Sequence, residues 1–185
     1  DYVLKFARPW SCTLPVIGKD GLMSWDNAFE CPQGSDTVAL THASFAHDAL
    51  MFTDVPDGVL TLLGAKSGQG VRVEFPGFPY IGVWSAANDA PFVALEPWSG
   101  HTTAHDEDDV FEHKAGMTLL APGETNERTF HLTDVWHLHV IDCFCHYCRT
   151  LSNVTKYRPC SVWQLFTEYV ILSYSIGFPI LGAGP

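Results

Sequence analysis

The chain has 185 residues, a formal net charge of −11, and 46% hydrophobic residues. This length is typical of one domain, and the apolar content is sufficient for a packed core. The negative charge argues against nucleic acid or an anionic membrane surface as a partner, and it suits neutral or small ligands. No uninterrupted apolar run of about 18 residues is present, so the sequence predicts no transmembrane helix.

Charge and cysteine content change near residue 134. Residues 1–134 contain nineteen acidic and seven basic side chains, whereas residues 135–185 contain two acidic and three basic ones. Four of the six cysteines lie in the second part, at positions 143, 145, 148 and 160. We therefore predict a boundary here, with residues 135–185 an unassigned tail rich in cysteine and aromatic residues, which is either the product of a frameshift or read-through or a domain of another kind.

The start of the chain also carries information. It opens on Asp1 without an initiator methionine, which indicates that the sequence begins inside a longer protein. No basic segment followed by an apolar core is found there, so no signal peptide is predicted. Sparse cysteine in the first part is typical of a reducing compartment, and we expect a cytoplasmic location.

The first half of the chain reads as short strands separated by turns. Residues 1–6 resemble a strand, residues 9–21 look mostly irregular, and residues 23–35 look like a loop or weak hairpin. Alternating or apolar runs bounded by Gly, Pro and Asp are typical of strands. Such runs occupy residues 37–40, 49–53, 59–63 and 71–75. We expect the last three to form an antiparallel meander.

Two further apolar runs, at residues 80–84 and 91–95, flank the turn-forming segment 85–90. Glu96 follows the second run directly. A carboxylate at the end of a buried strand costs free energy unless it is paired or used. On this pattern alone, Glu96 is either a satisfied structural carboxylate or a functional group.

The remaining segments complete an all-β pattern. Residues 101–109 are polar and predict a loop, residues 111–116 a helical turn, and residues 117–120 and 127–133 two more strands. The acidic run at 106–109 lacks the alternating ligands and glycine of a calcium loop, so a solvated loop is favoured. The pattern as a whole predicts an antiparallel β-sandwich or barrel.

Five segments, in the same order and at similar spacing, resemble the aldose 1-epimerase (galactose mutarotase-like) family, in its LacX-like branch. The most specific is NDAPFVALEPWSG at residues 88–100. The others are FAHDALMF at 45–52, FPYIGVWS at 78–85, EHKAG at 112–116 and LAPGE at 120–124. The resemblance covers roughly residues 1–133 and stops where the composition changes.

The resemblance implies that the chain is the C-terminal portion of a large antiparallel β-sandwich that binds a free sugar. The family interconverts the α and β anomers of an aldose such as galactose or glucose by acid–base ring opening, without a metal or organic cofactor. By the motif match, Glu96 is the catalytic base and Asp48 contacts sugar hydroxyls. Trp98 and Trp84 could offer an apolar face to a pyranose ring, although core packing is the simpler interpretation of Trp84.

One departure from the family pattern affects activity. The family's acid, a histidine in an HPxFN motif, has no counterpart in this sequence, and His42 and His47 do not occur in that context. We therefore expect little or no mutarotase activity from this chain and activity from a longer parent. The alternatives are a non-catalytic carbohydrate-binding remnant or module, and a half-sandwich that does not fold stably alone.

The tail also contains clustered histidines and cysteines. Their C-x-C-x-x-C spacing lacks the paired CxxC knuckles typical of zinc sites, and we predict no metal site. The only partner that the sequence indicates is a small-molecule sugar.

Overall fold

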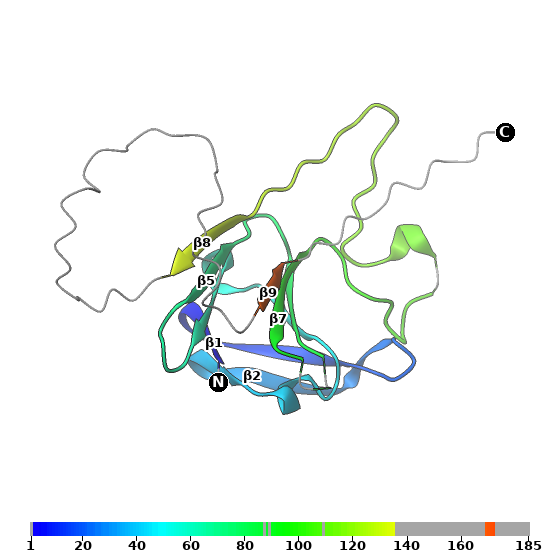
Figure 1. The fold of residues 1–185 in the computed structure, drawn as a ribbon. Helices are drawn as coiled ribbons and strands as arrows, with labels where there is room; N and C mark the ends of the chain where they lie inside the picture. Colours follow the sequence, from blue (N-terminus) through cyan, green and yellow to red (C-terminus); the bar gives the residue numbers. More distant parts are fainter. Residues whose placement is uncertain (1, 87, 89, 109, 136–168, 173–185) are drawn as a thin grey trace, which may run out of the picture.

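The structure, a computed structural model, describes residues 2–86, 88, 90–108, 110–135 and the backbone of 169–172. Nearly all of its regular structure is β, in a five-stranded sheet of order β2-β1-β4-β5-β8 and a four-stranded sheet of order β3-β6-β7-β9 (Figure 1). This confirms the predicted all-β, largely antiparallel fold class. The strands are β1 (Tyr2–Ile17), β2 (Met23–Leu40), β3 (Leu50–Thr53), β4 (Val59–Gly64), β5 (Gly70–Glu74), β6 (Tyr80–Trp84), β7 (Phe92–Trp98), β8 (His131–Val135) and β9 (Tyr169–Leu172).

The first two strands form one long hairpin, which runs from the pair Tyr2↔Leu40 to the pair Ile17↔Met23. The predictions of irregular structure at 9–21 and of a loop or weak hairpin at 23–35 were therefore wrong, because residues 23–40 form one strand. Each proline in this region falls within a shift of register between β1 and β2. A bulge leaves a residue outside the ladder, so a proline there removes no ladder hydrogen bond.

The predicted meander is correct in one pairing and wrong in the other. β4 and β5 pair antiparallel, with Val59 opposite Glu74. β3 instead joins the other sheet, where Leu50 lies opposite Val83 of β6. Between β3 and β4 the chain turns through Asp54 and Asp57, both with positive φ, and through the short 3-10 helix η2 (Pro56–Gly58). A tight turn between two strands therefore does not require them to pair.

The core lies between the two sheets. Phe6 of β1 and Phe52 of β3 meet edge to face, with ring centroids 5.3 Å apart, and join the layers. The most deeply buried members of this cluster are Leu4, Leu14, Leu60, Leu62 and Val73 from the five-stranded sheet, and Phe52, Ile81, Val83 and Leu95 from the four-stranded sheet. Alternation along β7 then turns Glu96 away from the core.

The last part of the described chain departs from expectation in two places. β8 begins at His131 and pairs with β5, four residues later than the predicted start at 127. Residues 117–120 form no strand, and Leu119 and Leu120 are exposed on an excursion that leaves the sheets (Figure 1). The predicted helical turn is confirmed as the 3-10 helix η3 (Phe111–His113).

The tail contributes one strand to the described structure. β9 pairs with β7 in parallel, which makes it the exception to the antiparallel pairing among the strands described. The clustered cysteines and histidines of the tail lie outside the described residues, and its separation at residue 134 stays a prediction. None of the helices in the described part of the chain is long and apolar enough to cross a membrane.

Gly70 offers a test of the β4–β5 register. A Cβ placed there would lie 1.8 Å from the carbonyl oxygen of Leu62, which is held in the neighbouring strand. Because backbone cannot rotate aside, we expect Gly70→Ala to lower the free energy of unfolding by about 2–3 kcal/mol or more. Urea unfolding followed by circular dichroism measures this.

Gly64→Ala is the matched control, because its Cβ would come closest to the hydroxyl of Ser67, a side chain that can rotate away. Equal urea midpoints for the two variants would show that the register is wrong.

Candidate functional site

The outer face of the four-stranded sheet brings Glu96 together with two tryptophans. In one row across the sheet, Met51 of β3 lies opposite Gly82 of β6, and Gly82 lies opposite Glu96 of β7. Trp98 lies opposite Tyr80 in the row on one side, and Trp84 lies opposite Ala94 in the row on the other. Since side chains two residues apart share a face, Trp84, Glu96 and Trp98 point to the same side of the sheet.

Glu96 is held by the neighbouring indole. Nε1–H of Trp98 donates a hydrogen bond to Oε2 of Glu96, with the two atoms 3.1 Å apart, and both side chains are half-buried. The indole lies over Gly82, where a Cβ would come within 2.4 Å of the Trp98 Cζ2 atom. Glycine at position 82 thus makes room for the ring that orients the carboxylate.

The two tryptophans have different surroundings. Trp84 packs against Phe92, with ring centroids 5.5 Å apart, and is half-buried. Trp98 belongs instead to a second hydrophobic cluster on the outer face. That cluster consists of Met23, Met51, Ala104, Tyr80 and Trp98. Trp84 is therefore outside the main core, contrary to the simple core-packing interpretation.

The chain that follows β7 returns to close one end of this face. The Met23 amide donates to the Thr103 carbonyl, and the His105 amide donates to the Met23 carbonyl, each at 2.9 Å. This places the start of β2 beside the segment after Trp98, although the two are about 80 residues apart in sequence. The floor beneath the Trp98 ring is thus built from three distant parts of the chain.

Sequence reasoning did not identify His101 and Tyr80 as neighbours of the site. Their rings meet edge to face with centroids 5.1 Å apart, and Tyr80 shares the outer face with Glu96. His101 Nδ1 lies 2.7 Å from the Thr102 carbonyl, an acceptor, so Nδ1 carries the hydrogen. The available signal was position in the sequence, because Tyr80 lies within the segment 78–85 and His101 directly follows the segment 88–100, both of which carry the family resemblance.

Asp48 does not lie in the same row as Glu96. It follows the 3-10 helix η1 (His42–Phe45), is exposed, and has a φ of 67°. Its amide donates to the Phe45 carbonyl at 3.1 Å, which closes the turn before β3. His42 and His47 are exposed on the same turn. A contact between Asp48 and a sugar stays a prediction.

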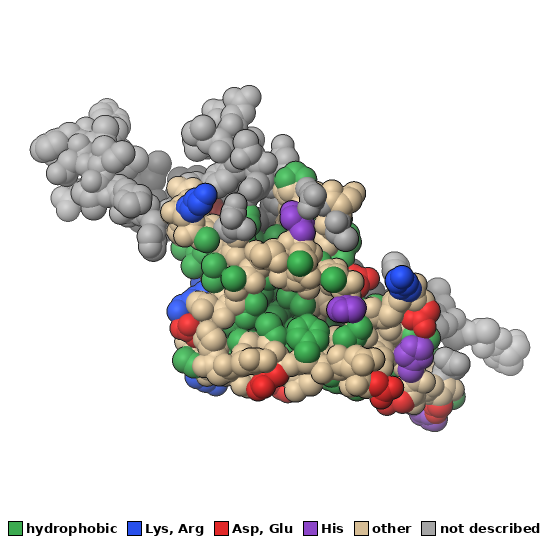
Figure 2. Space-filling model, turned by 90° about the horizontal axis from the view of Figure 1, so that it is seen from below, with side chains coloured by type: hydrophobic (Ala, Val, Ile, Leu, Met, Phe, Trp, Pro, Cys, Tyr) green, Lys and Arg blue, Asp and Glu red, His purple; other side chains and the backbone are tan. Residues whose placement is uncertain are grey.

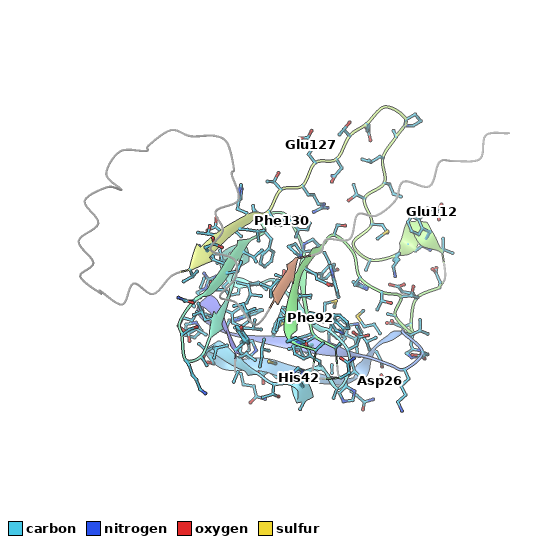
Figure 3. All side chains as sticks on the ribbon, in the orientation of Figure 1. Asp26, His42, Phe92, Glu112, Glu127 and Phe130 are labelled. Carbon is cyan, nitrogen blue, oxygen red and sulfur yellow. The ribbon has the colours of Figure 1, made fainter. Side chains whose placement is uncertain are left out.

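The surface of the molecule is mixed in character. Figure 2 shows hydrophobic side chains gathered in the middle of the face seen from below, with histidine side chains beside them as well as at the lower right, and acidic side chains mostly along the lower and right margins. Figure 3 places Phe92 near the base of β7, and Glu112 on η3, well away from it. Within the described residues, no group of three or more His, Cys, Asp or Glu side chains could hold a metal ion.

Comparisons with known proteins agree with this fold. No family model matches the chain. The chain is 34% identical over 134 residues to the chromosomal and the plasmid LacX proteins of Lactococcus lactis subsp. lactis, and these residues make up 72% of this chain and 45% of each relative. This similarity supports the predicted resemblance to an aldose 1-epimerase-like family. The chain thus spans a little under half the length of these relatives.

A solved structure supports the fold of this chain. A galactose mutarotase related enzyme from Lactobacillus acidophilus superposes with a TM-score of 0.55 at 24% identity, covering 72% of this chain and 43% of that one. The predicted fold class is thereby confirmed, and the LacX relatives support the predicted family. The roles of Glu96, Asp48, Trp84 and Trp98 stay predictions.

A partly buried ion pair braces the loop beside the site. Lys114 Nζ donates to Glu107 Oε2 at 2.8 Å and to Thr103 Oγ1 at 3.3 Å, and the Lys and Glu side chains are 16% and 18% exposed. The hydrogen bond from Lys114 is the main reason that the pKa of Glu107 lies below its ordinary value. Gly116, with a φ of +77°, then packs the chain against the Ser99 carbonyl and Tyr80.

We expect Lys114→Met to lower the melting temperature by roughly 2–4 °C at pH 7. A lowered folded-state pKa stabilises the fold above the unfolded pKa, and this stability is lost as the pH falls through the folded value. The difference between variant and native chain should therefore shrink below the ordinary Glu pKa of 4.5. Thermal melts from pH 7 to pH 3 measure it.

Lys66→Met, on the exposed turn between β4 and β5, is the control for removal of a positive charge. A Lys114→Met difference that stays constant with pH would show that Glu107 is not the partner.

Proposed function

We propose that this chain supplies the base-bearing wall of a sugar site in an aldose 1-epimerase, which interconverts the α and β anomers of a free hexose such as galactose or glucose. The observation that carries the proposal is Glu96 on the outer face of the sheet, oriented by the Trp98 indole 3.1 Å away. The aldose 1-epimerase-like family of the matched residues supports the same chemistry.

The proposed reaction needs a base, an acid and no redox step. Glu96 accepts the proton of the C1 hydroxyl while an acid protonates the ring oxygen, and the C1–ring oxygen bond breaks to give the open aldehyde. Rotation about the bond between C1 and C2 followed by closure, with the protons returned, yields the other anomer. The family's acid motif is not found in this sequence, so we assign only the basic half of the reaction to this chain.

The two tryptophans are proposed to bind the apolar face of the pyranose. Trp98 and Trp84 lie in the rows on either side of the Glu96 row. A flat aromatic surface buries the C–H groups of a sugar ring and leaves its hydroxyls to polar partners such as Asp48. The scarcity of Lys and Arg, ten in the whole chain, favours a neutral hexose over a sugar phosphate.

A carbohydrate-binding protein without turnover is the second candidate. It is favoured by the same aromatic face together with the missing acid motif. NMR titration with galactose or glucose measures binding, and polarimetry on the freshly dissolved α-anomer measures turnover. Binding with turnover that depends on Glu96 supports the epimerase, binding without such turnover supports the binding protein, and no binding contradicts both.

A further inference from the structure

Two cysteines face each other across the hairpin of β1 and β2. Ser11 lies opposite Gln33, and Thr13 lies opposite Glu30. Between these two pairs, β1 has one residue, Cys12, and β2 has two, one of which is Cys31. Opposed residues of antiparallel strands have Cα atoms about 4.5–5.5 Å apart. This spacing falls inside the window of roughly 4.4–6.8 Å that a disulfide needs.

The two side chains also share a face of the hairpin. Cys12 is 6% exposed and belongs to the main hydrophobic core, and Cys31 is half-buried and packs against the same core. Cys12 Sγ lies 3.7 Å from the Thr53 carbonyl oxygen of β3, and both thiols are free. The hairpin therefore holds two free thiols on neighbouring strands, on either side of the register shift between Ser11 and Thr13.

We propose that Cys12 and Cys31 form a redox modification site, at which a peroxide joins the two sulfur atoms in a disulfide across the β1–β2 hairpin. Cys31, the more exposed thiol, attacks the peroxide oxygen as the thiolate and becomes a sulfenic acid, while the O–O bond breaks and one water leaves. Cys12 then attacks the sulfenic sulfur and releases a second water. Two thiols are oxidised and one hydrogen peroxide is reduced to two waters.

The disulfide should stabilise the folded chain. It closes a loop of 20 residues from Cys12 to Cys31, and constraint of the unfolded chain by a loop of this size raises the melting temperature by roughly 6–12 °C. Burial, and to a smaller extent the neighbouring Cys12, raise the pKa of Cys31, so the thiolate is scarce at neutral pH. The oxidation is therefore best run at mildly alkaline pH.

The test uses the full chain with the four tail cysteines changed to serine, so that Cys12 and Cys31 alone remain. After hydrogen peroxide treatment, we expect the intact mass to fall by two hydrogens. Trypsin cleaves after Lys5, Lys19 and Lys66 and should release peptides 6–19 and 20–66 as one linked species that dithiothreitol separates. The same linked pair is expected from the unsubstituted chain.

Cys12→Ser in the tail-serine chain is the control, and it should give no internal link. Three outcomes would overturn the proposal. One is a disulfide between two chains in place of the internal link. Another is stable oxidation of Cys31 alone. The third is an internally linked chain with a lower melting temperature than the reduced chain.

Discussion

Glu96→Gln is expected to lower the rate of mutarotation that the chain supports in the presence of an external acid by a factor of about 10²–10⁴. The amide cannot accept the C1 hydroxyl proton, but its oxygen can still accept the hydrogen bond that Trp98 donates to Glu96. The variant therefore loses the base and keeps the geometry of the face. Imidazole buffer supplies the external acid, in place of the acid motif that the sequence lacks.

The measurement is polarimetry on freshly dissolved α-galactose and α-glucose at increasing imidazole concentration. The rate in buffer without protein is subtracted at each concentration. We expect the native chain alone to show little acceleration, and we expect the difference between native chain and Glu96→Gln to grow with imidazole. NMR titration should give the same sugar affinity for both proteins within about threefold, because the hydrogen-bonded face is retained.

Glu74→Gln is the matched control. Glu74 is a glutamate of β5 on the other sheet, where it pairs with Arg72 at 2.7 Å. We expect it to have no effect on mutarotation. If Glu96→Gln matched the native chain at every imidazole concentration, the assignment of Glu96 as the base would be wrong.

Gly82→Ala is expected to weaken sugar binding at least tenfold while the protein stays folded. The new Cβ would lie 2.4 Å from Trp98 Cζ2, so the indole must leave its place over β6. Its hydrogen bond to Glu96 then breaks, and both proposed contacts with the sugar are lost together. The cost of overpacking should be about 1–3 kcal/mol of unfolding free energy.

NMR gives two readouts of this variant. Titration with galactose gives the affinity, and the indole N–H resonance of Trp98, assigned by its loss in Trp98→Ala, reports the hydrogen bond. In the Trp98→Ala background the ring is gone, so Gly82→Ala should cost much less stability than in the native chain. Gly64→Ala, in the other sheet, should leave sugar affinity unchanged. An unchanged Trp98 resonance in Gly82→Ala would contradict the packing of the indole on the glycine.

Some of the fold was predictable because its signals are local. Alternation of side chains between the two faces of a strand, or a short apolar run, is visible in a few consecutive residues, and these signals located β4, β5, β6 and β7 near their observed bounds. The turn formers at 85–90 indicated the β6–β7 hairpin, which the structure has. These elements depend on short stretches of chain, so a single sequence is sufficient to find them.

The long β1–β2 hairpin was missed for a physical reason. Pro9, Pro15 and Pro32 interrupt the local strand pattern of this region, since proline has no N–H for a ladder. The structure places each of them in a shift of register, where no ladder bond is required. Whether a bulge can form there depends on the partner strand, which the local pattern does not contain.

By itself, the sequence determined the all-β class, the family resemblance and the position of Glu96 after an apolar strand. The tertiary structure decided which sheet β3 joins, which face Glu96 shares with Trp84 and Trp98, and that Tyr80 and His101 meet beside them. The reason lies in the range of the forces involved. Strand formation follows alternation within a segment, whereas pairing, register and the neighbours of a side chain depend on contacts between residues far apart in the chain.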